Sequence, residues 1–141
     1  MTALSNDTKR DYREGVDHPY PVAASQIIYG NALTCINANG YAVPGSDTAG
    51  LIFVGVSEQK ANNGDGSDGD KEVVVRRRHV HKVKIASTIT QANVGDKVYL
   101  VDDDTMDLAA QTENDIYGGV IVGFINGSAA WVDIEPAVMQ A

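Results

Sequence analysis

The chain has 141 residues, of which 43% are hydrophobic, and its formal net charge at pH 7 is −8. This length fits a single domain with its own core, and the apolar content excludes a wholly disordered chain. No run reaches the roughly 18 consecutive apolar residues of a membrane-spanning helix. The acidic balance argues against nucleic acid or an anionic membrane as a partner of the whole surface.

The first 21 residues differ from the rest of the chain. They mix acidic and basic side chains without a sustained apolar period, and they lack the basic start and apolar stretch of a secretory signal. Pro19 and Pro21 hold the backbone extended, because a proline restrains its own φ and the residue before it. We therefore predict an extended N-terminal arm over residues 1–21, a β-rich domain over residues 22–141, and synthesis in the cytoplasm.

Downstream of the arm, short β-rich runs alternate with turn sequences. The predicted strands are Gln26–Ile36, Leu51–Val56, Glu72–Ile85, Lys97–Val101, Met106–Ala109, Tyr117–Ile125 and Ala129–Ile134. Asn39-Gly40 and Asn126-Gly127-Ser128 have the composition of hairpin turns, and Asp102–Thr105 forms a further turn. The run ANNGDGSDGD at Ala61–Asp70 predicts a flexible, solvated loop that buries almost nothing.

The spacing of these elements predicts the fold class. Turns recur about every 8–12 residues between β-branched runs, which is typical of an all-β protein with a small barrel or sandwich. Helical periodicity is not sustained over three turns, although Thr88–Val94 fits one helical turn. Glu72–Ile85 has no cleanly apolar face, so we expect this long strand to be bent or bulged.

Basic and acidic residues are separated along the chain. Five of the eleven Lys and Arg residues are Arg76, Arg77, Arg78, Lys82 and Lys84, and no Lys, Arg or His follows Lys97. The acidic residues after that point are Asp102, Asp103, Asp104, Asp107, Glu113, Asp115, Asp133 and Glu135. This separation predicts pairing of opposite charges, either across strands or across a subunit boundary. The basic cluster lacks the aromatic platforms or recognition helix of a nucleic-acid binder.

Candidate metal-binding and catalytic residues are few. The loop sequence NGDGSDGD fails the EF-hand spacing, because the required Gly and the final Glu are missing from their places. His79 and His81 would share one face of a strand, but the basic residues around them repel a cation. Asp102–Asp104 fit a solvated turn, and Cys35, the single cysteine, cannot form an intramolecular disulfide. We expect no metal, no cofactor and no catalytic centre.

Four phrases that together span most of residues 22–135 occur in a characteristic order. They are PVAASQIIYGNALTCINANGYAVPGSDTAGLIFVGVSEQ, NNGDGSDGDKEVVVRRR, ITQANVGDKVYLVDDDTM and a glycine-rich strand pair that ends in GSAAWVDIE. In this order the chain resembles the small head decoration, or capsid cement, proteins of tailed bacteriophages and prophages. None of the phrases is a catalytic signature.

The resemblance implies a compact, tulip-shaped β-barrel body that sits on the outer surface of the capsid in the virion. It implies the major capsid protein as the partner and a homo-oligomer, commonly a trimer at a local three-fold position. The N-terminal arm would then add to the sheet or loops of the capsid protein. Such a protein is made in the host cytoplasm and acts as a structural cement, not as an enzyme.

Candidate interaction residues follow from these expectations. The arm side chains expected to fill pockets on the partner are Leu4, Tyr12, Val16 and Tyr20. An extended arm of this length reaches on the order of 60 Å at about 3.3 Å per residue, which is enough to cross onto adjacent subunits. The basic residues expected to face acidic surface of a neighbouring copy or of the capsid are Arg76, Arg77 and Arg78.

Two alternatives belong to other functional classes. A surface-displayed β-domain that recognises a host ligand or glycan would use the loop at residues 61–71, and ligand-dependent attachment to cells would favour it. A metal-dependent hydrolase would use His79, His81 and nearby carboxylates, and metal analysis of the purified protein tests it.

Overall fold

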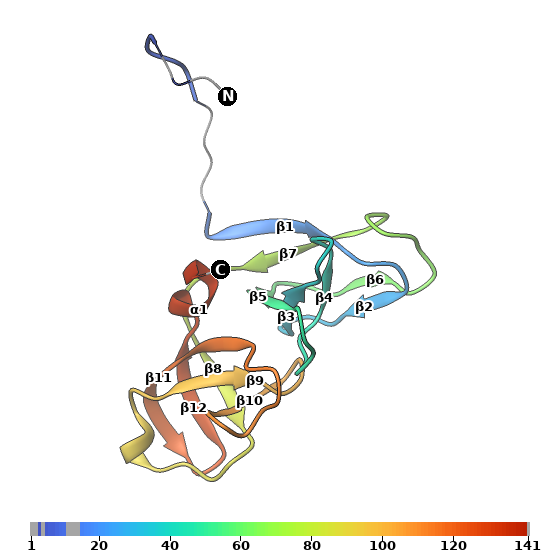
Figure 1. Cartoon of the computed structure of the whole chain (residues 1–141). Helices are drawn as coiled ribbons and strands as arrows, with labels where there is room; N and C mark the ends of the chain where they lie inside the picture. Colours follow the sequence, from blue (N-terminus) through green and yellow to red (C-terminus); the bar gives the residue numbers. More distant parts are fainter. Residues whose placement is uncertain (1–2, 4, 11–14, 141) are drawn as a thin grey trace.

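The computed structural model describes residues 3, 5–10 and 15–140, and the predicted all-β class is confirmed (Figure 1). The strands are β1 (Asp17–Pro21), β2 (Gln26–Ile28), β3 (Leu33–Ile36), β4 (Ala42–Pro44), β5 (Ile52–Ser57), β6 (Ala61–Asn63), β7 (Glu72–Arg76), β8 (Val80–Ile85), β9 (Lys97–Leu100), β10 (Thr105–Leu108), β11 (Tyr117–Asn126) and β12 (Ala129–Asp133). The helices are a 3-10 turn, η1 (Gln91–Asn93), and α1 (Glu135–Gln140). None of the described helices has the length and apolar character needed to cross a membrane.

Five strands form an antiparallel sheet in the order β1-β7-β5-β3-β4. Its two ends approach each other just after β1, where Val22 forms a parallel bridge with Ala42 of β4. The Ala23 amide also donates to the Ala42 carbonyl at 2.9 Å. The sheet therefore curls around its own apolar cluster, in which Ile28 of the short β2-β6 pair packs with Val73 of β7.

The remaining strands close into a barrel in the order β10-β8-β12-β11-β9. Neighbours are antiparallel except β8 and β10, which run parallel. Because successive residues of a strand point to opposite faces, every second side chain enters the barrel. On β12 the inward residues are Ala130 and Val132, and on β9 they are Val98 and Leu100, all fully buried. Side chains thus fill the barrel, as expected for so few strands.

The sheet and the barrel share one core. The sheet residues that pack into the barrel's apolar cluster are Leu33, Cys35, Phe53 and Val56. Phe53 and Val56 face the same way because β5 is bulged at Gly55, which has φ 138°. A Cβ at residue 55 would overlap the Arg76 carbonyl oxygen, so the bulge requires glycine. The two layers consequently bury their facing sides against each other.

The predicted long strand Glu72–Ile85 is divided between the two layers, which confirms the expected break in its path. β7 ends at Arg76 in the sheet, and β8 begins at Val80 in the barrel. Between them His79 has φ 85°, a left-handed conformation that is uncommon for a residue other than glycine. The basic cluster therefore lies at the junction of the sheet and the barrel.

Residues 17–21, which the sequence analysis assigns to the arm, form β1 of the sheet. All five pair with β7, from Asp17 opposite Arg76 to Pro21 opposite Glu72. A proline is tolerated in an edge strand because its missing donor faces away from the neighbour. The sheet thus begins five residues before the predicted domain boundary. Residues 5–10 are exposed and lie apart from the body in Figure 1.

The segment Ala61–Asp70 is more structured than its composition suggests. Its first three residues form β6, and Asn63 is only 2% exposed. The Asn63 side-chain amide lies within hydrogen-bond distance of the carbonyls of Val22, Ala23 and Ser67, at 3.2, 3.0 and 2.9 Å. The prediction that this segment buries almost nothing is wrong, because a short polar side chain here satisfies buried backbone groups.

The two helices differ in how well they could be predicted. The helical turn expected within Thr88–Val94 is present as η1, which Thr90 caps by accepting from the Ala92 amide. The sequence analysis does not predict α1, because six residues are too few to show helical periodicity. Ala137 and Val138 of α1 pack into the shared core.

Candidate protein-interaction surface

The arm side chains expected to bind a partner fall into two groups. Leu4 and Tyr12 lie outside the described residues. Val16 and Tyr20 lie against the chain's own body: the Val16 carbonyl accepts from the Arg77 amide at 2.7 Å, and Tyr20 packs half-buried against the sheet's apolar cluster. The Tyr20 ring also lies 4.8 Å from the His18 ring. Val16 and Tyr20 therefore contribute to the fold of this chain.

The three arginines of the basic cluster contact other groups of the same chain. Arg76 forms a 3.0 Å hydrogen-bonded ion pair with Glu58. Arg77 donates to the Gly15 carbonyl at 3.0 Å, and its buried Nε has no hydrogen-bond partner among the described residues. Arg78 lies 3.7 Å from the Glu135 carboxylate with about half of its side chain exposed. The cluster thus has less free positive charge than its sequence indicates.

Pairing of the basic segment with the acidic segment occurs across neighbouring strands. The Lys84 ammonium on β8 lies 2.6 Å from the Asp104 carboxylate, which directly precedes β10. Both side chains are more than 60% exposed, so solvent screens this pair and it adds little stability. It does hold the lysine head group at a defined place on the outer barrel wall.

The outer edge of β1 is poorly suited to strand addition. The Val22 amide donates to Lys71 at one end of β1, and the Val16 carbonyl accepts from Arg77 at the other. Hydrogen-bonding residues alternate along an antiparallel strand, so the backbone groups of residues 17, 19 and 21 face outward. Two of these three are prolines, which have no N–H to donate. This edge therefore presents mainly backbone carbonyls, and an added strand would find few N–H donors there.

A different surface carries the largest outward-facing aromatic group. The outward side chains of β8, β12 and the bulged part of β11 include Val80, Lys82, Lys84, Val122 and Trp131, which we call the Trp131 face. Trp131, Val80 and Val122 are each 44–46% exposed. Exposed apolar side chains that are neighbours on one face mark contact sites more often than isolated ones do.

The strand geometry explains why Trp131 is held in place. Trp131 pairs with Gly123 of β11 on one side and with Lys82 of β8 on the other. A Cβ at residue 123 would lie 2.9 Å from the indole Cδ1, so the glycine leaves room for the ring to lie on the strand. A β-bulge between Ile121 and Gly123 turns Val122 outward beside it. The ring is therefore ordered in the free protein.

A shallow hollow of about 450 Å³ adjoins this face. The lining includes Lys82, Lys84, Thr105, Asn126, Ser128 and Ala129. Lys82 forms no ion pair among the described residues, whereas Lys84 is paired with Asp104. The Trp131 face thus combines an apolar centre with one lysine, Lys82, that is unpaired among the described residues, on a chain whose net charge is −8.

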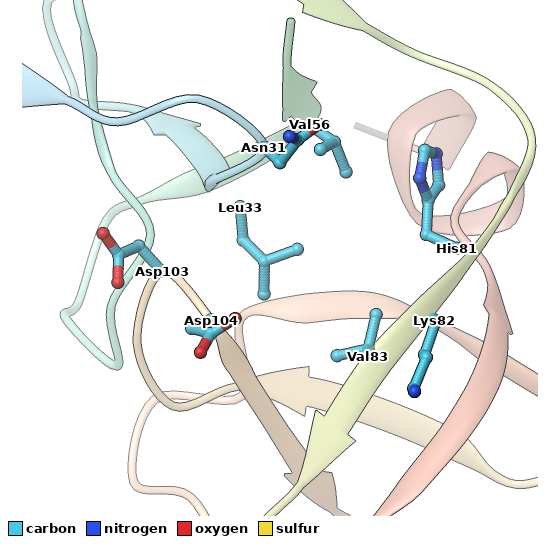
Figure 2. A pocket seen from close by; sticks show the side chains of 8 residues that line it. All are labelled: Asn31, Leu33, Val56, His81, Lys82, Val83, Asp103 and Asp104. Carbon is cyan, nitrogen blue, oxygen red and sulfur yellow. The ribbon is translucent and has the colours of Figure 1, made fainter. Parts of the chain in front are cut away.

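A second pocket, of about 230 Å³, lies where the sheet meets the barrel (Figure 2). His81 and Lys82 line one side, and Asp103 and Asp104 line the other, with the Asp103 carboxylate directed away from the His81 ring. Burial lowers the pKa of His81, and the charges of Arg76 and His79 add to the shift. Burial raises the pKa of Asp103, with a further contribution from Asp102 and Asp104.

This pocket brings one of the two histidines of the hydrolase alternative, His81, together with the carboxylates of Asp103 and Asp104. His79 is not part of its lining. Across the part of the chain that the structure describes, no three His, Cys, Asp or Glu side chains gather in a way that could hold a metal ion. The His81 ring is instead within 2.9 Å of the Arg78 carbonyl.

The sequence analysis did not single out Trp131 as an interaction residue. The alternation in Ala129–Asp133 contained the necessary information, because two small or branched apolar residues, Ala130 and Val132, flank the tryptophan and are buried. A tryptophan between two inward positions must face outward. Comparison with known proteins gives no guidance here, since no protein-family model matches the chain and no curated protein matches it significantly.

Proposed function

We propose that this chain is a structural, non-enzymatic protein that binds the outer surface of an assembled bacteriophage head. In this proposal it stabilises the head by bridging subunits of the major capsid protein, and it acts as a homo-oligomer, with a trimer favoured. The resemblance of its sequence phrases to capsid cement proteins motivates the proposal. The observation that carries it is the Trp131 face, an exposed apolar surface with Lys82, unpaired among the described residues, beside it on a chain of net negative charge.

The chemistry of this face suits binding to protein. An aromatic residue that is already fixed loses little conformational entropy on binding, and buried tryptophans are common hot spots of protein interfaces. Lys82 adds charge complementarity to an acidic partner surface. Each copy on a capsid lattice contacts several subunits, so modest contacts add up through multivalency. Residues 5–10 are exposed and take no part in the sheet, so they are available to contact a neighbour.

The direct test is attachment to expanded heads that lack this protein. Replacing Trp131 with Ala should weaken the affinity for heads by at least about tenfold, which is the effect of losing one interface hot spot. Co-sedimentation over a range of protein concentrations measures this affinity. The Trp131→Ala variant should still fold, because the indole is 44% exposed and does not belong to the buried cluster of the barrel. Tyr29→Ala is the matched control: Tyr29 is 56% exposed but follows β2 of the β2-β6 pair, outside the barrel that carries the Trp131 face, so this variant should attach normally.

Two results would contradict the proposal. If the unmodified protein does not co-sediment with heads, the chain is not a capsid protein of this kind. If it binds cells or glycans instead, and loses that binding on Trp131→Ala, the surface-displayed binding module is the better explanation, since an open indole ring also stacks on other ligands.

A further inference from the structure

The chain contains three Asn-Gly pairs: Asn39-Gly40, Asn63-Gly64 and Asn126-Gly127. Asparagine is thermolabile, and a following glycine makes it more so, because the glycine nitrogen is unhindered when it attacks the side-chain carbonyl carbon. We propose that Asn126 is a site of intramolecular self-modification in the folded protein, and that the fold protects Asn39 and Asn63 from the same reaction.

The reaction needs only water. The Gly127 nitrogen gives up its proton to solvent and bonds to Cγ of Asn126, while the bond from Cγ to Nδ2 breaks and the nitrogen leaves, protonated, as ammonia. Water then opens the resulting cyclic imide at either carbonyl. The products are aspartate or isoaspartate at position 126, with one amide exchanged for one carboxylate and no change in oxidation state.

The turn between β11 and β12 leaves the attacking nitrogen available. The Gly127 amide donates no hydrogen bond among the described residues, although its carbonyl accepts from the Ile89 amide at 3.0 Å. The carbon under attack is also activated. Asn126 Oδ1 accepts from the Ser128 amide at 2.8 Å and from the Ser128 hydroxyl at 3.0 Å, and these donors stabilise negative charge that develops on the oxygen.

The other two pairs lack this arrangement. The Gly40 amide donates to the Asn37 carbonyl at 2.9 Å, and the Gly64 amide donates to Asn62 Oδ1 at 3.0 Å. Each must break that hydrogen bond before it can attack. Asn63 is protected further, because its own side-chain amide is buried against three carbonyls.

The modification would change the charge of the surface beside it. Asn126 lines the hollow that adjoins the Trp131 face, together with Lys82 and Lys84. A carboxylate at position 126 adds one negative charge to the lining that these lysines share. The modified protein should therefore separate from the original as a more acidic form on ion exchange.

The test is to incubate the folded protein at mildly alkaline pH and to follow each site by peptide mapping. Conversion raises the mass of a peptide by about one unit. The Asn126 peptide should convert roughly three to ten times faster than the Asn39 peptide, the factor that one hydrogen bond contributes, and the Asn63 peptide should be slowest. Equal or faster conversion at Asn39 or Asn63 would overturn the proposal.

Two controls separate the fold from the local sequence. In concentrated urea the conversion rates of the three Asn-Gly sites should converge. If Asn126 still converts faster than the other two sites by the same factor in the unfolded chain, the structure is not the cause. Gly127→Ala should slow conversion at Asn126 alone, because the added Cβ hinders the attacking backbone nitrogen. This variant should fold, because Gly127 does not have a positive φ and a Cβ there would meet nothing nearer than 3.6 Å. An unchanged rate of conversion at Asn126 in Gly127→Ala would also refute the mechanism.

Discussion

A single polar side chain organises the loop between β6 and β7. Asn63 is fully enclosed and its amide lies against three backbone carbonyls. Gly66 completes this arrangement, since a Cβ at that position would overlap Asn63 Oδ1. Asp68 and Asp70 also accept from backbone amides, at 2.7 and 2.8 Å. Two of the three acidic residues of this loop thus hold its backbone in place.

Replacing Asn63 with Ala should lower the free energy of unfolding by about 2–4 kcal/mol, because several buried carbonyls lose their donor. Urea denaturation followed by circular dichroism measures this. Asn62→Ala is the matched control: Asn62 is exposed and, among the described residues, its side chain accepts only from the Gly64 amide, so the change should cost less than about 1 kcal/mol. Equal losses in the two variants would show that Asn63 has no special role.

At the scale of elements, β1 (Asp17–Pro21) marks the point at which the N-terminal segment joins the sheet. It covers β7, so that Val73 and Val75 are almost completely buried. Tyr20 also packs against the sheet's apolar cluster. The sequence-based assignment of residues 17–21 to an arm overlooked this, because two prolines in five residues are atypical of a strand.

Two truncations should separate folding from attachment. A variant that begins at Gly15 keeps β1 and the contacts to Arg77, so its free energy of unfolding should change by less than about 1 kcal/mol. A variant that begins at Val22 loses β1 and should lose about 2–4 kcal/mol. Thermal or urea denaturation distinguishes them, and equal stability of the two would mean that β1 contributes nothing. Attachment to heads should be tested with the Gly15 variant only.

The sequence predicts where the strands lie along the chain better than it predicts which strands and side chains contact one another. Alternation and turn composition predicted the positions of most strands, because both depend on neighbouring residues. They did not predict that Glu72–Ile85 passes from the sheet to the barrel, since this depends on the conformation of one residue, His79. Nor did they predict the engagement of Arg76 and Arg77, whose partners are Glu58 and Gly15, 18 and 62 residues away.

At the scale of the whole molecule, the sheet and the barrel share a core and should unfold together. The chain offers one natural probe in each layer. Trp131, the only tryptophan, reports on the barrel by fluorescence, and Cys35, the only cysteine, reports on the sheet by alkylation. Burial raises the pKa of the Cys35 thiol to about 12, so the folded protein holds it protonated and unreactive.

The two probes should give the same urea midpoint, because each layer loses its packing when the other unfolds. Alkylation should therefore begin only where the fluorescence changes. A lower midpoint for Cys35 than for Trp131 would show that the sheet opens first and that the shared core is not cooperative.

Pro19 and Pro21 at the edge of β1 affect how closely packed copies of this protein behave. Copies held side by side at high local concentration tend to join through exposed strand edges, and such joining grows into aggregates. Here one edge offers few donors, and the other is covered where Val22 and Ala23 meet β4. The sheet is therefore poorly suited to growth at either end, and copies in a dense array should not join through their strand edges.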